Sequence, residues 1–378
     1  MKRRFTIQIH TGGYDTAPAQ LDVPAVLGKL SRIYENAHID CVMIGWNPRA
    51  EIDVIVDFLK ERGTDVYLWL PVFSGLDGLS PLIGTDGKPV VHSYKAEKGE
   101  RFDFGCPVDL ENLRRFKLFF ETHFRGRHFD GVFLDKIRFP SFISGSGPVL
   151  TCFCPYCTPL HKISGEIELF EGENPLSLTS YSGLRYTMAD KRLARLFDYK
   201  ANAVTTAIAE LADFFRVRGY KVGLDLFAPY LSFFVGQDYA GLAPHADFIK
   251  PMFYRETYAP AGLPFELDMY ANAFGGDPDV IASRKRFLLD VLSAPAIDVD
   301  FINREIAGIR NVIGDTKLYA GIEINYNERI APVTARYIRE NITGLKNADG
   351  FALSWDLCST PDENIDAVLS AANVPVHA

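Results

Sequence analysis

The sequence predicts an α/β protein built as a single (β/α)8 barrel, in which parallel strands and helices alternate along the chain. Three observations support this prediction. Eight short apolar runs typical of strands recur along the 378 residues, and polar, helix-compatible stretches separate them. No Gly-x-Gly-x-x-Gly loop follows the first run, which argues against an open dinucleotide-binding sheet. The length also suits one barrel, because such barrels often run past about 250 residues as one domain.

The strands and helices are expected in strict alternation. The predicted strands are Phe5–His10, Ile39–Trp46, Asp65–Phe73, Phe129–Ile137, Tyr220–Phe227, Ala246–Tyr254, Lys317–Tyr326 and Gly350–Leu357. The helical candidates between them include Pro24–Asn36, Ala50–Arg62, Leu110–His123, Ala189–Arg218, Ser283–Ala294, Asp298–Ile313 and Ala331–Gly344. This order favours a parallel sheet, and the number of strands favours its closure into a barrel.

Two segments are longer than ordinary loops. Ser74–Asp109 follows the third predicted strand, and Ser141–Lys191 follows the fourth and contains a cysteine cluster. Because both follow strand ends, we expect them to cover the C-terminal face of the barrel, where such proteins keep their sites. The domain prediction is therefore one barrel over residues 1–378, with residues 141–191 as an inserted lid or small subdomain.

Composition narrows the classes of partner. The chain has 40 Lys and Arg against 48 Asp and Glu, a net charge of -8, which argues against nucleic acid or an anionic membrane as the main partner. No apolar run reaches the roughly 18 residues that span a bilayer, and the start, MKRRFTIQIHTGG, lacks the apolar core of a signal peptide. Six Cys in the chain are too few for a disulfide scaffold. We expect a cytoplasmic protein, or a secreted one if a signal peptide has been removed.

Four acids fall on the predicted interior face of the barrel. Side chains alternate along a strand, and the faces rich in glycine and alanine are expected to point inward. A carboxylate there costs several kcal/mol unless it is paired or hydrogen-bonded. The acids either pair with Lys250, Arg138 or Arg255, or together line a site; as a set they favour a site. They are Asp135, Asp225, Glu323 and Asp356.

Paired carboxylates across a pocket suit the cleavage of a glycosidic bond, because one can protonate the leaving oxygen while the other attacks or activates water. Aromatic side chains near the same strand ends suit a sugar ring, whose CH groups pack on aromatic faces. The candidate substrate-binding residues near these strand ends are His10, Trp46, Trp69, Arg138, Lys250, Tyr254, Asn325, Tyr326, Trp355 and Asp356. The expected partner is a carbohydrate.

One segment resembles a known family. Phe129-Asp-Gly-Val-Phe-Leu-Asp135-Lys-Ile-Arg138-Phe-Pro140 is similar to the fourth-strand signature of (β/α)8 glycoside hydrolases, closest to loosely characterised families near the α-amylase-like and polygalactosaminidase-like barrels. Two further segments fit, Gly223 to Asp238 and Ala246 to Tyr254. The resemblance implies a glycosidase that needs no cofactor for catalysis, with Asp135 as a catalytic acid.

The partner of Asp135 stays open at this stage. The α-amylase-like barrels end their fifth strand with a Glu, where this chain has Asp225. Another clan uses a Glu that ends the seventh strand, a position that Glu323 fits. Our hypothesis makes Asp135 the nucleophile or stabilising carboxylate and Glu323 the acid/base. Asp225 and Asp356 would then bind sugar hydroxyls or tune pKa values, and retention and inversion are both open.

The cysteine cluster predicts a structural metal site. Cys152, Cys154, Cys157 and His161 form the pattern Cys-x-Cys-x2-Cys-x3-His, which fits a tetrahedral Cys3His zinc site. The alternative is a set of packed, reduced thiols or one disulfide. Four protein ligands would leave no open position, so a bound zinc would hold the insertion together. The other cysteines, Cys41, Cys106 and Cys358, are expected to be scattered thiols.

Three other functions remain as alternatives. Lys250 inside a barrel could form a Schiff base with a carbonyl substrate, as in class I aldolases and related lyases. A non-catalytic carbohydrate-binding barrel would keep the aromatic residues and bind sugar without turnover. A metal-dependent hydrolase would need a His-x-His pair after the first strand, where only His10 is present.

Overall fold

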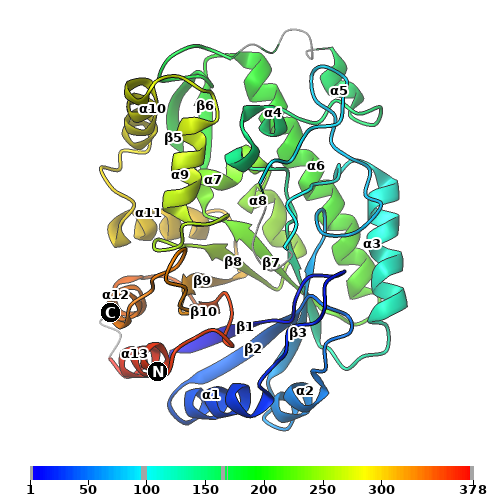
Figure 1. Cartoon of the computed structure of the whole chain (residues 1–378), viewed down its shortest axis with the longest axis vertical. Helices are drawn as coiled ribbons and strands as arrows, with labels where there is room; N and C mark the ends of the chain where they lie inside the picture. Colours follow the sequence, from blue (N-terminus) through cyan, green and yellow to red (C-terminus); the bar gives the residue numbers. More distant parts are fainter. Residues whose placement is uncertain (1–2, 95–99, 163–166, 168, 375–378) are drawn as a thin grey trace.

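The computed structural model of the chain describes residues 3–94, 100–162, 167 and 169–374 (Figure 1). Its centre is a closed barrel with the strand order β1-β10-β9-β8-β7-β4-β3-β2, and all neighbouring strands in it run parallel. Every one of the eight predicted runs overlaps one barrel strand, so the predicted (β/α)8 fold is confirmed. The strands are β1 Arg4–His10, β2 His38–Gly45, β3 Asp65–Pro71, β4 Gly131–Asp135, β7 Lys221–Phe227, β8 Phe248–Met252, β9 Lys317–Glu323 and β10 Gly350–Ser354.

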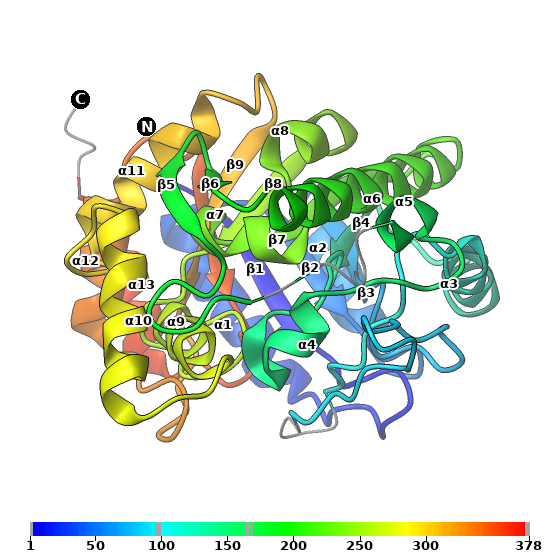
Figure 2. The ribbon, with the colours of Figure 1, turned by 90° about the horizontal axis from the view of Figure 1, so that it is seen from above.

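The helices surround the strands when the molecule is seen from above (Figure 2). Several of them begin at an Asp whose carboxylate accepts a backbone N–H of the first turn, among them α1 at Asp22, α3 at Asp109 and α6 at Asp190. The longer helices are α1 Val23–Asn36, α2 Asp53–Lys60, α3 Leu110–His123, α6 Lys191–Arg216, α9 Leu263–Asn272, α10 Pro278–Val291, α11 Val299–Arg310, α12 Ala335–Gly344 and α13 Asp362–Ala372. None of the helices in the described residues is long and apolar enough to span a membrane.

The two insertions lie beyond the C-terminal ends of β3 and β4. The first folds back on itself through the bridges Ser74–Phe104 and Pro81–Gly105. The second gathers at the upper end of the molecule in Figure 1. It contains η2 Phe142–Ser144, α4 Ser146–Val149, α5 Thr158–His161 and the hairpin β5 Leu178–Ser182 with β6 Arg185–Met188. Between β7 and β8 the chain forms only the short α7 Pro229–Ser232, η4 Phe233–Val235, α8 Tyr239–Leu242 and η5 Ala243–His245.

Aromatic rings fill the lower part of the barrel interior. The ring of Phe248 lies 5.6 Å from that of Phe133 and 5.2 Å from that of Tyr67, measured between centroids. Glycines on neighbouring strands make room for these rings: a Cβ at Gly131 would come within 2.4 Å of Tyr67, and one at Gly223 within 2.3 Å of Phe248. The small residues therefore do mark the interior, and they let large rings pack against one another there.

Candidate active site

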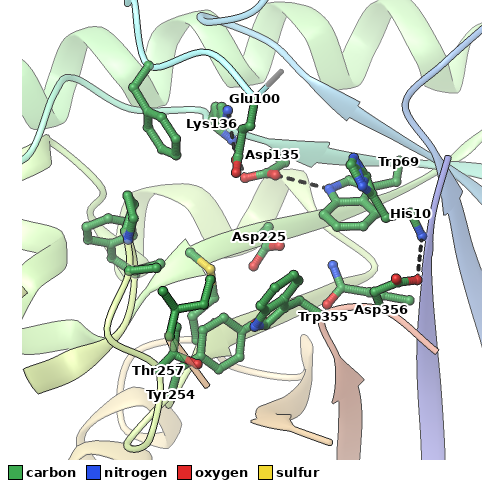
Figure 3. Close-up of a pocket in the computed structure, with 18 of the residues that line it drawn as sticks. His10, Trp69, Glu100, Asp135, Lys136, Asp225, Tyr254, Thr257, Trp355 and Asp356 are labelled. Atoms are coloured by element: carbon green, nitrogen blue, oxygen red, sulfur yellow. Dashed lines mark hydrogen bonds and ion pairs between the residues drawn. The ribbon is translucent and has the colours of Figure 1, made fainter. Parts of the chain in front are cut away.

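A cavity of about 330 Å³ opens above this aromatic layer, at the C-terminal ends of the strands and beside the first insertion (Figure 3). Its size falls at the lower end of the range for small-molecule sites. Most of the predicted site residues line it. They are His10, Trp46, Trp69, Asp135, Arg138, Asp225, Tyr254, Trp355 and Asp356, joined by Gln8, Phe227 and Met252 from the strand faces predicted to point inward.

All three tryptophans of the chain line this one cavity. The ring of Trp46 lies 5.4 Å from that of Trp69 and 4.8 Å from that of His10, in edge-to-face arrangements. The indole Nε1 atoms of Trp46 and Trp355 are buried and have no hydrogen-bond partner among the described residues. A buried N–H without a partner costs free energy. These two donors therefore suit a ligand that combines apolar faces with hydroxyl groups.

Asp135 ends β4 and is the most exposed of the four predicted interior acids. Its carboxylate accepts hydrogen bonds from Trp69 Nε1, at 3.1 Å, and from the backbone N–H of Lys136. The backbone at Lys136 has a left-handed conformation, with φ of 48°, which turns the chain away from the strand just after Asp135. These contacts hold the carboxylate in one orientation at the edge of the cavity (Figure 3).

The register of the sheet places Asp135 beside Asp225. Leu134 pairs with Leu224 across β4 and β7, so the next residues, Asp135 and Asp225, occupy equivalent positions. Asp225 pairs in turn with Lys250 on β8. The three neighbouring strands β4, β7 and β8 thus carry Asp135, Asp225 and Lys250 at one level of the barrel. Side chains at matching register point to the same face of the sheet, so all three point inward.

Asp225 and Lys250 form a buried ion pair, since Lys250 Nζ lies 3.0 and 3.1 Å from the two carboxylate oxygens. Lys250 Nζ also donates a hydrogen bond to the hydroxyl of Tyr254. Burial raises the pKa of Asp225 to about 7; Lys250 opposes this shift and the negative charge of Asp135 adds to it. Burial likewise lowers the pKa of Lys250, against the pull of Asp225. The two acids of the cavity therefore differ in environment, although they are neighbours.

Asp356 lines the cavity but is fixed by its own loop. Its carboxylate accepts hydrogen bonds from the backbone N–H of His10 at 3.2 Å, the backbone N–H of Cys358 at 3.1 Å and the hydroxyl of Ser359 at 3.1 Å. These bonds tie the end of β1 to the turn after β10. The arrangement holds the rim of the cavity in place, next to Trp355 (Figure 3).

Glu323, predicted as the acid/base, does not lie where a ligand in the cavity would contact it. Its side chain is fully buried and does not line the cavity. The carboxylate accepts hydrogen bonds from the backbone N–H groups of Glu256 and Thr257, at 2.9 and 3.1 Å, and from the hydroxyl of Tyr337. The loop after β8 thus folds over the end of β9 and uses Glu323 as an anchor. Burial raises the pKa of Glu323, and its hydrogen-bond donors oppose that shift.

Three predicted substrate-binding residues also lie away from the cavity surface. Tyr326 is 48% exposed, and Asn325 is buried and accepts a hydrogen bond from the backbone N–H of Trp355. Both follow the end of β9 at Glu323, so the alternation of the strand does not extend to them. Lys250 has no exposed surface and reaches the cavity only through Asp225 and Tyr254.

Several lining residues escaped the sequence analysis because loops bring them in. Glu100 lies beside Asp135 and forms an ion pair of 3.0 Å with Lys136 Nζ (Figure 3). The only sequence signal for this residue is its place in the long first insertion. The others from loops are Tyr94 and Phe102 of that insertion, Lys136 after β4, Thr257, Ala259, Pro260 and Ala261 after β8, and Asn327 and Ile330 after β9.

Arg138 forms part of the wall and lies between two rings. Its guanidinium carbon is 4.5 Å from the centroid of Phe104 and 4.3 Å from that of Phe227. Burial lowers the pKa of Arg138 to about 10, and nearby carboxylates, led by Glu266, oppose this shift. Arg138 thereby joins the end of the first insertion to β7.

The cysteine cluster has a different fourth member from the one predicted. Cys152, Cys154 and Cys157 converge with Cys106 of the first insertion, and all four are buried. The Nε2 atom of His161 lies 2.9 Å from the carbonyl oxygen of Cys154 and is not part of the cluster. The structure thus brings Cys106, which was expected to be a scattered thiol, into the cluster at the place predicted for His161. Residues 106 and 152 are distant in the sequence, and only the folding of both insertions brings them together.

The fold and this cavity define a (β/α)8 barrel with an acidic, tryptophan-lined site at its C-terminal face. No family model matches the chain, and neither does any curated protein. Solved structures do match it. The PgaB (BpsB) glycoside hydrolase domain from Bordetella bronchiseptica is 14% identical, over 98% of this chain and 97% of that one, with a TM-score of 0.54. A chitinase from Chromobacterium violaceum is 12% identical, over 98% and 99%, with a TM-score of 0.47. At 14% identity the likeness to the PgaB (BpsB) domain concerns the fold, which is the fold that the sequence resemblance implied.

Proposed function

We propose that the chain is a glycoside hydrolase that cleaves an oligo- or polysaccharide, with Asp135 and Asp225 as its two working carboxyl groups. The observation that carries this proposal is the placement of both acids at one register level, in a cavity lined by all three tryptophans. A cavity of this composition offers apolar faces for sugar rings and two carboxyl groups for the glycosidic oxygen and the anomeric carbon. The fold shared with the PgaB (BpsB) glycoside hydrolase domain supports it.

In this proposal Asp225 replaces Glu323 as the proton donor. Asp225 retains a proton up to about pH 7, because its pKa is raised, and can deliver that proton to the leaving oxygen as the glycosidic bond breaks. Asp135, held by Trp69 and the backbone of Lys136, attacks the anomeric carbon or activates the water that does so. In either route a water molecule supplies the hydroxyl group of the new reducing end. The proton that this water gives up is taken by one of the two carboxylates, Asp135 or Asp225.

Lys250 is a poor candidate for Schiff-base chemistry. Its amine has no exposed surface and is bound by Asp225 and Tyr254, so a carbonyl substrate in the cavity would meet the acid before the amine. The arrangement favours a role in which Lys250 controls the charge of Asp225.

The activity is tested by incubating the purified protein with reducing-end-labelled oligosaccharides of glucose, galactose and hexosamine, chitooligosaccharides included. We expect shorter products with new reducing ends, detected by mass spectrometry, from at least one class. Binding of a sugar in a calorimetric titration without any cleavage of that sugar would instead make the chain a non-catalytic carbohydrate-binding barrel and overturn the proposal.

Trp355 provides a test of sugar stacking. Replacing Trp355 by Ala should raise KM by about 3- to 10-fold, because one aromatic contact is worth about 0.5–1.5 kcal/mol. The value of kcat should change less, since Trp355 forms no hydrogen bond with Asp135 or Asp225 in the part of the chain that the structure describes. Steady-state kinetics on the cleaved oligosaccharide measure both. An unchanged KM would show that the ring does not hold the sugar.

The raised pKa of Asp225 predicts how the catalytic activity depends on pH. Below about pH 7 the carboxyl group carries the proton that the leaving group needs, and above it the proton is lost. We therefore expect kcat/KM to fall as the pH rises through about 7. The pH profile of the Asp225→Asn variant should lack this decline, and its kcat/KM should be much lower than that of the unmodified protein. If kcat/KM of that variant still declined with the same midpoint, a group other than Asp225 would be responsible for the pH dependence.

A further inference from the structure

Four buried thiols of the two insertions meet at one point that the proposed function does not use. The Sγ atom of Cys154 lies 3.7 Å from that of Cys106 and 3.6 Å from that of Cys157, and Cys106 lies 3.6 Å from Cys157. The fourth, Cys152, belongs to the same group, in which all sulfur atoms lie within 4.8 Å of one another. A disulfide needs about 2.05 Å between sulfurs, so these are four separate thiols.

The spacing of the sulfur atoms fits a tetrahedral metal ion. A zinc ion with four sulfur ligands at about 2.3 Å places neighbouring sulfurs about 3.8 Å apart. The three separations among Cys106, Cys154 and Cys157, which are 3.6, 3.6 and 3.7 Å, are close to that value. The ligand set is entirely sulfur, which selects zinc, copper(I) or iron over magnesium and calcium.

The backbone around the cluster supports the same conclusion. The N–H of Ile83 points at Cys152 Sγ, at a distance of 3.3 Å, and such donors stabilise negative charge on sulfur. Cys154 and Cys157 form a tight turn in which the N–H of Cys157 donates to the carbonyl of Cys154 at 2.9 Å. This turn presents two sulfurs to the same point, in the Cys-x2-Cys spacing common in structural zinc sites.

We propose that Cys106, Cys152, Cys154 and Cys157 bind one structural zinc ion that joins the two insertions. Each thiol gives up its proton to solvent as its sulfur binds the metal. Four sulfur ligands leave no open coordination position, so the ion holds the structure together and takes no part in a reaction. The inference is independent of the proposed glycosidase function.

The position of Cys106 shows what the ion stabilises. Cys106 ends the arm formed by residues 100–106, which also carries Glu100 and Phe102 of the cavity wall and Phe104, stacked on Arg138. Asn112 of α3 binds the carbonyl oxygen of Cys106 at 3.0 Å, so the arm is fixed on one side by the helix. The zinc ion would fix it on the other side, to the segment of Cys152 to Cys157.

The test is the metal content of the purified, untagged full-length protein. Plasma mass spectrometry should find about one zinc per chain, and X-ray absorption at the zinc edge should show four sulfur neighbours at about 2.3 Å. Cys106→Ser should lose most of the zinc, whereas His161→Asn and Cys358→Ser should retain it, because neither residue belongs to the cluster.

Two results from the unblocked protein and its variants would overturn the assignment. One is an unmodified protein without zinc, or with iron in its place. The other is zinc that survives in Cys106→Ser but is lost in His161→Asn, which would restore a Cys3His site. If Cys106→Ser does not fold, the test uses the unmodified protein alone. Blocking its thiols with a mercurial reagent should release the zinc, and a chelating dye measures the released ion. Zinc that stays bound after all cysteines are modified would also contradict a thiolate site.

Discussion

Replacing Asp135 by Asn is expected to lower kcat/KM by about 10²- to 10⁴-fold, the range for a carboxyl group that acts on the reacting atoms. The amide has nearly the same shape and can still accept the hydrogen bond from Trp69, so the fold should persist. What it cannot do is carry the negative charge that attack on the anomeric carbon, or activation of water, requires. The measurement is steady-state kinetics on the cleaved oligosaccharide, with circular dichroism to compare the folds.

A matched control lies at the other end of the same strand. Asp130 precedes β4, binds the backbone N–H of Val66 at 2.7 Å and pairs with Lys60, far from the catalytic face. Asp130→Asn should keep most of the activity, whatever its effect on stability. Full activity in Asp135→Asn would remove Asp135 from the mechanism, and equal losses in both variants would point to a general effect on the fold.

Replacing Lys250 by Met is expected to lower the free energy of unfolding by about 3–5 kcal/mol at neutral pH. The reason is that the buried carboxyl group of Asp225 loses its partner and must either hold an uncompensated charge or take up a proton, and both cost free energy. Asp225 is 2% exposed and both its carboxylate oxygens are bound by Lys250, so solvent replaces the lost amine poorly. Urea denaturation measures the change. Lys221→Met, which breaks an exposed pair with Asp65 at the start of β7, should cost at most about 1 kcal/mol.

The effect of Lys250→Met should depend on pH in one direction. Without the amine, the pKa of Asp225 rises further above the about 7 it has in the native protein. An unfolded Asp has a pKa near 3.9, so between about pH 4 and the raised value the native state binds more protons than the unfolded state. Stability of the variant must then fall as the pH rises, and the loss should be smaller at pH 5 than at pH 8. A loss that is independent of pH would show that burial of charge is not its cause.

The strands were predictable because their signal is local. Apolar runs such as Lys317–Tyr326 report burial on both faces, and alternation within them placed Asp135 and Asp225 on the interior side. The register adds what alternation cannot: Leu134 opposite Leu224 makes Asp135 and Asp225 neighbours. No sequence pattern within either strand encodes that pairing.

Predictions failed where one loop covers another element. Glu323 points inward, as its place in the strand indicates, yet the N–H groups of Glu256 and Thr257 close over it. Glu100 shows the reverse case, because a polar residue in a long insertion reaches the cavity without any local signal. Loop paths depend on contacts between distant segments, and these contacts leave no periodicity in the chain.

The sequence by itself determined the barrel, the end of the barrel that carries the site, and the inward strand faces on which the candidate acids lie, because period-two alternation and strand order are local properties. Only the tertiary structure decided which acids share the cavity and which thiol completes the cluster. Asp225 rather than Glu323 lies beside Asp135, and Cys106 rather than His161 joins Cys154. Both outcomes depend on where two long insertions and one loop come to rest, and packing between segments far apart in the chain fixes those positions.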